Sequence, residues 1–162
     1  MSTTDYDKLL ATIEAQEREL QFDSFSNDDA WALGSALVEK ARSRHLAIAI
    51  DIRRGEQQLF HYAFAGTSAD NDQWIIRKNR VVNRFGRSSF AVGRALAKDG
   101  TTMEAKHYLS SADYASHGGA FPLILKGTGH IGTVTVSGLP QEDDHALVVE
   151  TIREFLASRR KG

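Results

Sequence analysis

The chain has 162 residues, of which 41% are hydrophobic and 25% charged, and its formal net charge is -1. That length suits one domain with a buried core and is too short for two ordinary domains, so we predict a single domain over residues 1–162. The near-neutral charge disfavours a nucleic-acid partner. The absence of cysteine excludes disulfides, a thiolate nucleophile and zinc–thiolate sites. A polar N-terminus and the lack of a long apolar run predict a soluble cytoplasmic protein with no membrane partner.

Hydrophobic spacing predicts two helices in the first third of the chain. Residues 4–21 and 27–44 each carry apolar side chains at helical spacing, and the second stretch opens on an Asn-Asp-Asp cap. The apolar stripe of the first helix is thin, so this N-terminal segment, within residues 1–21, is also a candidate for contacts with another subunit. Between the two helices, alternating apolar residues over 20–25 predict a short strand.

The rest of the chain is predicted to alternate pairs of strands with helices. Two hairpins are expected, over residues 46–52 with 58–64 and over residues 122–126 with 130–136. Helices are expected over residues 70–85, 88–98 and 140–160. Because successive strands are joined mainly by hairpins, the predicted fold class is α+β. We expect about five strands in a mainly antiparallel sheet flanked by helices, with long N- and C-terminal helices.

A cationic stretch in the middle of the chain is the first candidate site. Its residues are three arginines at helical 3, 4 spacing, a fourth arginine and two hydroxyls at the start of the next helix: Arg77, Arg80, Arg84, Arg87, Ser88 and Ser89. Unpaired amides and the helix dipole attract anions at such a start, so this stretch predicts a carboxylate or phosphate site. The alternative is a solvated helix face followed by a serine N-cap.

A second candidate site lies at the two ends of the last predicted hairpin. In an antiparallel pair, the start of one strand lies beside the end of the other, which brings His117, Gly118 and Gly119 next to Ser137 and Gly138. Backbone amides and an imidazole placed there predict a small polar-ligand site. The alternative is that the glycines only shape a bend and a strand-to-helix connection.

The start of the last helix adds Asp144 and His145 to this candidate pocket. Acidic residues in a first helical turn also serve the helix dipole without any ligand. The six histidines include no pair at the spacing of a helical zinc motif, so no metal site is predicted. His61 and His117 are conceivable haem ligands. The chain has no nucleophile elbow, Walker loop or dinucleotide-binding glycine motif.

Several short sequence motifs, taken together, resemble those of a known superfamily. They are Gly-Gly-x-x-Pro-Leu at residues 118–123, Gly132, Val-Ser-Gly at 136–138, and the acidic helix start through Asp144. These are similar to the haem-degrading-domain superfamily, also called HbpS-like or GlcG-like. Further motifs resemble more closely its branch called uncharacterised protein family UPF 0303. They lie at residues 49–53, 70–74, 77–80, 84–89, 114–119 and 136–145. The resemblance implies a profilin-like α+β layout, a homo-oligomer of dimers or larger, and haem as a possible cofactor.

Three functions are compatible with these residues. The preferred one is a soluble oligomeric domain that binds a small anionic ligand. The second is a haem-binding or haem-degrading protein, as the family resemblance implies. The third is a non-catalytic assembly module in which Trp74, Phe85 and Phe90 are interface anchors, because aromatic residues and arginine are enriched at interfaces.

Overall fold

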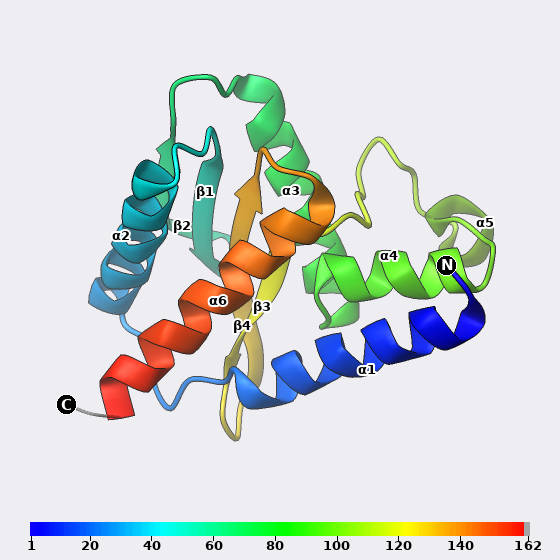
Figure 1. The fold of residues 1–162 in the computed structure, drawn as a ribbon, viewed down its shortest axis with the longest axis horizontal. Helices are drawn as coiled ribbons and strands as arrows, with labels where there is room; N and C mark the ends of the chain where they lie inside the picture. The colour runs from blue at the N-terminus through cyan, green and yellow to red at the C-terminus, as the bar shows by residue number, and fades with distance from the viewer. Residues whose placement is uncertain (161–162) are drawn as a thin grey trace.

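The computed structural model describes residues 1–160 as one sheet with helices on both faces (Figure 1). The helices are α1 (Thr3–Glu19), α2 (Asn27–Ser43), α3 (Ala69–Phe85), α4 (Ser89–Lys98), α5 (Met103–His107) and α6 (Gln141–Arg160). The strands are β1 (Ala49–Arg54), β2 (Gln57–Ala63), β3 (Ala120–Leu125) and β4 (Gly129–Ser137). The predicted α+β class is confirmed, and no helix within residues 1–160 has the length and apolar character needed to cross a bilayer.

The sheet has four strands in the order β2-β1-β4-β3, and every neighbouring pair is antiparallel. The prediction of about five strands is therefore wrong by one. The missing strand is the segment at residues 20–25, where Phe22 makes only one parallel bridge, to Leu125. Both Phe22 and Phe25 are buried in the core, and their rings contact each other. This segment therefore anchors its aromatic side chains without extending the ladder.

The register of the first hairpin places Asp51 directly opposite His61, so these two residues share a face of the sheet. This face continues along β4 with Thr133, Thr135 and Ser137, all of which are buried. Alternate residues of the same strands are apolar and point to the opposite face. The sheet therefore has one polar buried face and one apolar buried face.

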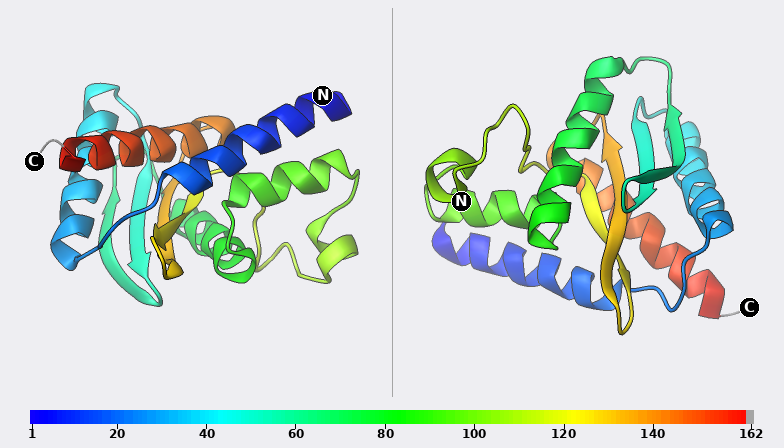
Figure 2. Two further views of the ribbon diagram at one scale, coloured as in Figure 1. Left: turned by 90° about the horizontal axis from the view of Figure 1, so that it is seen from below. Right: turned by 180° about the vertical axis from the view of Figure 1, so that it is seen from behind.

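Helices α2 and α6 cover the apolar face and form the main core with it (Figures 1 and 2). Helix α3 crosses the polar face, where Asn79 donates to Asp51 Oδ2 at 3.1 Å and accepts from the Thr135 hydroxyl at 2.5 Å. A buried polar group needs such partners, so this face is held by hydrogen bonds as well as by apolar contacts. The candidate site lies at one end of this polar layer.

Helix α1 runs along α4 (Figure 2). Ile13 packs there with Phe90 and Ala91 in a small apolar cluster separate from the main core. The capping box at Ser2 and Asp5 begins α1, and Ser26 with Asp29 forms the equivalent box for α2. The thin apolar stripe of the first helix is thus used within the same chain, against α4.

Candidate functional site

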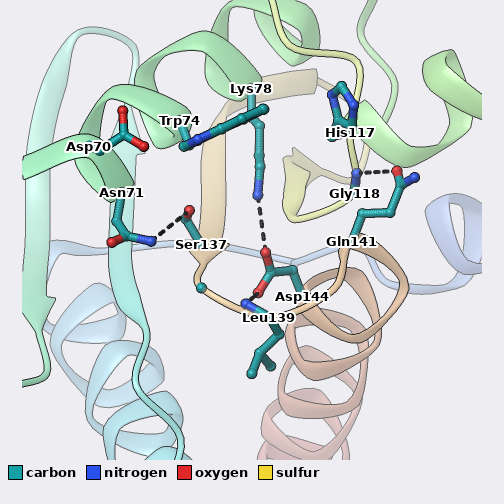
Figure 3. Close-up of a pocket in the computed structure, with 11 residues that line it drawn as sticks. Asp70, Asn71, Trp74, Lys78, His117, Gly118, Ser137, Leu139, Gln141 and Asp144 are labelled. Atoms are coloured by element: carbon teal, nitrogen blue, oxygen red, sulfur yellow. Dashed lines mark hydrogen bonds and ion pairs between the residues drawn. The ribbon is translucent and has the colours of Figure 1, made fainter. Parts of the chain in front are cut away.

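A cavity of about 290 Å³ opens between the start of α3, the turn before β3 and the connection from β4 to α6 (Figure 3). We call it the His117 cleft. The residues that line it are Asp70, Asn71, Trp74, Lys78, His117, Gly118, Ser137, Gly138, Leu139, Gln141 and Asp144. The antiparallel pairing of β3 and β4 brings the predicted segments around His117 and Ser137 to the same end of the sheet.

The floor of the His117 cleft is a buried ion pair between Lys78 of α3 and Asp144 of α6 (Figure 3). Lys78 Nζ donates to Asp144 Oδ2 at 3.2 Å and to the Val136 carbonyl at 3.1 Å. Asp144 Oδ1 accepts from the Leu139 amide at 3.0 Å. Burial lowers the pKa of Lys78 and raises the pKa of Asp144 to about 6, so for both groups burial outweighs their mutual attraction.

Two glycines allow the turn before β3 to lie against this ion pair. Gly119 has φ of +136°, and a Cβ there would overlap the Val136 carbonyl oxygen and come within 2.6 Å of Lys78 Nζ. A Cβ at Gly118 would overlap the backbone of Gln141. The Gly118 amide instead donates to the Gln141 side-chain oxygen at 3.0 Å. Glycine is therefore required at both positions for this close approach.

The walls of the cleft are aromatic on one side and polar on the other. Trp74 and His117 meet edge to face, with ring centroids 5.4 Å apart. Across the opening, Asn71 donates to the Ser137 hydroxyl at 3.4 Å. Burial lowers the pKa of His117, and the nearby charges of Lys78, Arg94 and Arg77 lower it further. The imidazole thus lies in a cationic environment and is neutral at pH 7.

The arginine stripe does not line the His117 cleft. Arg77 donates to the Ser111 carbonyl and lies over the Trp74 ring, with its guanidinium carbon 4.4 Å from the ring centroid. Arg80 donates to the Asp113 carbonyl, and Arg84 is exposed. The basic residue of this helix that reaches the cleft is Lys78, one position from Arg77, because the 3, 4 stripe faces the loop before β3 and solvent.

The predicted anion site at the start of α4 holds a carboxylate of the chain itself. Glu17 of α1 accepts from the Ser88 amide at 3.2 Å and pairs with Arg87 at 3.3 Å. Burial raises the pKa of Glu17, and Arg87 opposes that shift. Ser89 exchanges hydrogen bonds with the backbone of Ala120, at 3.1 and 3.4 Å. These three predicted residues therefore lie away from the cleft, against α1 and β3.

His145 follows Asp144 in sequence but points to another part of the molecule. Its Nε2 lies 2.8 Å from the Gln16 side-chain oxygen, and its ring packs 4.8 Å from Phe90. Burial lowers the pKa of His145 to about 4. Successive residues of a helix point about 100° apart, so Asp144 can face the cleft while His145 faces α1.

The three aromatic residues proposed as interface anchors lie in three different environments. Phe90 is buried, Trp74 forms a wall of the cleft, and Phe85 packs 4.8 Å from the His107 ring. The large aromatic side chains that are exposed are instead Trp31, Tyr62 and Tyr108.

Comparison with known proteins places the chain in a family. The family model described as "Haem degrading protein HbpS-like" matches residues 25–153. The chain belongs to this HbpS-like family. It is also 53% identical to a UPF0303 protein of Streptomyces coelicolor, over 96% of this chain and 99% of that protein. Both parts of the predicted resemblance, to the superfamily and to this branch, are confirmed.

Solved structures confirm the fold of this HbpS-like chain. A crystal structure of the Ybr137w protein superposes with a TM-score of 0.86 at 32% identity, covering 93% of this chain and 88% of that one. A crystal structure of a PduOC:Heme complex superposes with a TM-score of 0.65 at 17% identity, covering 80% of this chain and 94% of that one. The second likeness shows the shared fold.

The family name raises haem as a cofactor, and the His117 cleft does not fit one. An axial histidine for haem needs an open apolar slot beside it. The cleft next to His117 contains the charged side chains of Asp70, Lys78 and Asp144 instead. His61, the other conceivable ligand, lies outside this cleft: it lines a separate cavity with Trp31, Phe60 and Tyr62, and its Nε2 is 2.7 Å from the Asp72 carboxylate. Nowhere in residues 1–160 do three or more His, Cys, Asp or Glu side chains gather as around a metal ion.

Six residues that line the cleft were not among the predicted site residues: Asp70, Asn71, Trp74, Lys78, Leu139 and Gln141. Lys78 was one step from the arginine stripe, and its burial depends on how α3 rotates against the sheet. Trp74 was singled out only as an interface anchor. Arg94, which lines a neighbouring cavity, is the one charged residue between Phe90 and Ala97 of α4, and this position in an apolar stretch was the local signal that could have singled it out. For Lys78, perturbed titratable groups around a cavity were the signal needed, and that signal requires the structure.

Proposed function

We propose that this HbpS-like chain binds a small anionic molecule in the His117 cleft. The observation that supports the proposal is the hydrogen bonding of the Lys78 ammonium group. Its ammonium group has three N–H donors, and two of them go to Val136 and Asp144. Lys78 also lines the cleft, so its third donor is available to an anionic group there. A charge-assisted hydrogen bond of this kind is stronger where water is excluded.

Neutral groups around Lys78 support the same ligand class. The Ser137 hydroxyl and the His117 ring can each donate one more hydrogen bond toward the cleft. The first-turn amides of α6 contribute the positive end of the helix dipole, and the acidic side chains of the same turn, Glu142, Asp143 and Asp144, offset part of it. The Trp74 ring forms an apolar wall for the body of the molecule.

The acidic residues of the cleft restrict this ligand. Asp144 is paired with Lys78, whereas Asp70, which also lines the cleft, forms no ion pair within residues 1–160. A large or diffuse anion would contact Asp70, and like charges repel. The proposed ligand is therefore a small molecule whose anionic group reaches the floor.

The test is a calorimetric titration of wild-type protein with butyrate and inorganic phosphate, repeated on Lys78→Met and His117→Gln. We expect at least one probe to bind wild type, Lys78→Met to bind it roughly tenfold or more weakly, and His117→Gln to bind it a few-fold more weakly. Arg84→Ala, which removes an exposed arginine of the same helix, is the matched control and should bind as wild type does.

Far-ultraviolet circular dichroism of each variant establishes that it is folded before it is titrated. If wild type binds neither probe, or if folded Lys78→Met binds as tightly as wild type, the proposed function is wrong.

A further inference from the structure

A second cavity, of about 380 Å³, lies on the other side of His117. We call it the arginine cavity. It is an open cavity between α3, α4 and the loop before β3, and its polar lining includes Arg77, Arg94, Thr101, Ser111 and Ser116. His117 lines both this cavity and the His117 cleft. The two cavities are therefore neighbours that share one imidazole.

Two guanidinium groups in the arginine cavity have free donors. Arg94 forms no ion pair within residues 1–160, and its Nε is buried without a hydrogen-bond partner there. Arg77 donates only to the Ser111 carbonyl among these residues, through Nε and Nη2. Each guanidinium has five N–H donors, and a buried donor without a partner is destabilising.

The cavity also contains one carboxylate, which forms an ion pair with neither arginine among residues 1–160. Glu104 lines the cavity, but its side chain accepts from the Ser111 amide at 2.9 Å, and this bond lowers its pKa. Arg77, Arg94 and His117 line the same cavity, and both positive charges lower the pKa of His117. This part of the molecule differs from the start of α4, where Glu17 meets the local cation.

The backbone around Arg94 is closely packed, so its position is well defined. At Gly93 a Cβ would overlap the Ser116 carbonyl, and α4 therefore lies directly against the loop before β3. The Ala115 amide donates to the Arg77 carbonyl at 3.1 Å and holds the same loop to α3. Both arginines are thus attached to rigid elements that face each other across the loop.

We propose that the ligand is a dianion that spans His117, with one anionic group at Lys78 and the other between Arg77 and Arg94. This inference rests on the proposed function and adds the class of ligand. Guanidinium groups bind carboxylates and phosphates through paired hydrogen bonds, which a single ammonium cannot do. A dicarboxylate or a phosphorylated acid has the required chemistry.

The experiment compares molecules that differ in their second anionic group. Wild-type protein is titrated calorimetrically with butyrate, succinate, glutarate, adipate and phosphoglycolate at constant ionic strength. We expect at least one dianion to bind roughly tenfold or more tightly than butyrate. The best dicarboxylate length, and its rank against phosphoglycolate, identify which kind of second group the arginine cavity prefers.

Variants of Arg94 test where the second group binds. In Arg94→Met, the ratio of the affinity for the best dianion to the affinity for butyrate should fall to about one, while butyrate binding stays intact. Arg94→Lys should retain part of this preference for the dianion. Arg80→Met removes an exposed arginine of α3 and should retain the full preference. Equal binding of butyrate and every dianion to wild type, or an unchanged preference in Arg94→Met, would overturn this inference while leaving the proposed function intact if butyrate binding depends on Lys78.

Discussion

Two parts of the molecule carry similar cationic chemistry but differ in what neutralises it. At the α1–α4 junction, formed by Gln16, Glu17, Arg87, Ser88 and His145, the start of α4 is met by the Glu17 carboxylate. At the His117 cleft and its neighbouring cavity, Lys78 has one buried carboxylate partner, and Arg77 and Arg94 have none among residues 1–160. The junction is closed by the chain itself, whereas the cleft retains free donors.

This difference shows that a cationic stretch in a sequence does not by itself indicate a ligand site. Arg87 and Ser88 have the composition of an anion site, and their anion is supplied by a residue 70 positions earlier. Arg94 has no such composition around it and retains free donors in a cavity. What distinguishes the two places is whether another element of the fold brings an acidic side chain to them.

The largest effect is expected from breaking the buried ion pair in the cleft. Asp144→Ala leaves the Lys78 ammonium buried without its counter-ion, so we expect a loss of about 3 kcal/mol in the free energy of unfolding. Urea denaturation measures it. Asp143→Ala removes an exposed acid from the same helical turn and should cost less than about 0.5 kcal/mol.

The reverse change sharpens this prediction. Lys78→Met leaves Asp144 with the Leu139 amide as a donor and able to take up a proton, because burial already raises its pKa to about 6. The loss in the free energy of unfolding for Lys78→Met should therefore be smaller, about 1–2 kcal/mol. A loss for Asp144→Ala no greater than that for Lys78→Met would show that the floor of the cleft is not held as the structure indicates.

Much of the fold could be predicted because it depends on local patterns. The helices begin and end within a few residues of their predicted limits, since caps and hydrophobic spacing act over one or two turns. The pairing of the segments around His117 and Ser137 also followed, because an antiparallel hairpin determines which ends meet.

The rest of the site depends on how elements pack, which local patterns do not specify. A rotation of α3 by one residue decides whether Lys78 or Arg77 faces the sheet. Whether Glu17 reaches Arg87 depends on the path of α1 across α4, a contact between residues 70 positions apart. Asp144 and His145 are neighbours on one helix, yet one faces the cleft and the other the junction.

The next prediction uses His145 to probe the closed junction by pH. Burial lowers its pKa in the folded protein to about 4, from an ordinary value of 6.5. Between these values the unfolded chain binds a proton that the folded protein does not, so this group makes the protein less stable as the pH falls from 6.5 to 4. Between pH 6.5 and pH 4, we expect the free energy of unfolding of His145→Asn to fall by about 2 kcal/mol less than that of wild type. Urea denaturation at the two pH values measures this difference.

Asp144 has the opposite effect on stability over much of the same range. Because its pKa in the folded protein is raised to about 6, its protonation makes the protein more stable as the pH falls. Its effect is common to wild type and to His145→Asn, so it cancels in their difference. His45→Asn, which replaces an exposed histidine, should keep the wild-type dependence on pH. A His145→Asn protein with the same pH dependence as wild type would mean that this ring is not buried against α1.

The smallest effect tests the comparison most directly, by removing the carboxylate that closes the junction. Glu17→Ala leaves the Ser88 amide and Arg87 without their acceptor, and because Arg87 is partly exposed we expect a loss of only about 1 kcal/mol. Millimolar sulfate, compared with chloride at equal ionic strength, should restore about half of this loss, because the opened start of α4 can then hold an anion from solution. Glu14→Ala removes an exposed acid from the same helix and should show no sulfate-specific gain. If Glu17→Ala also gains nothing from sulfate, the carboxylate is not what separates the closed junction from the open cleft.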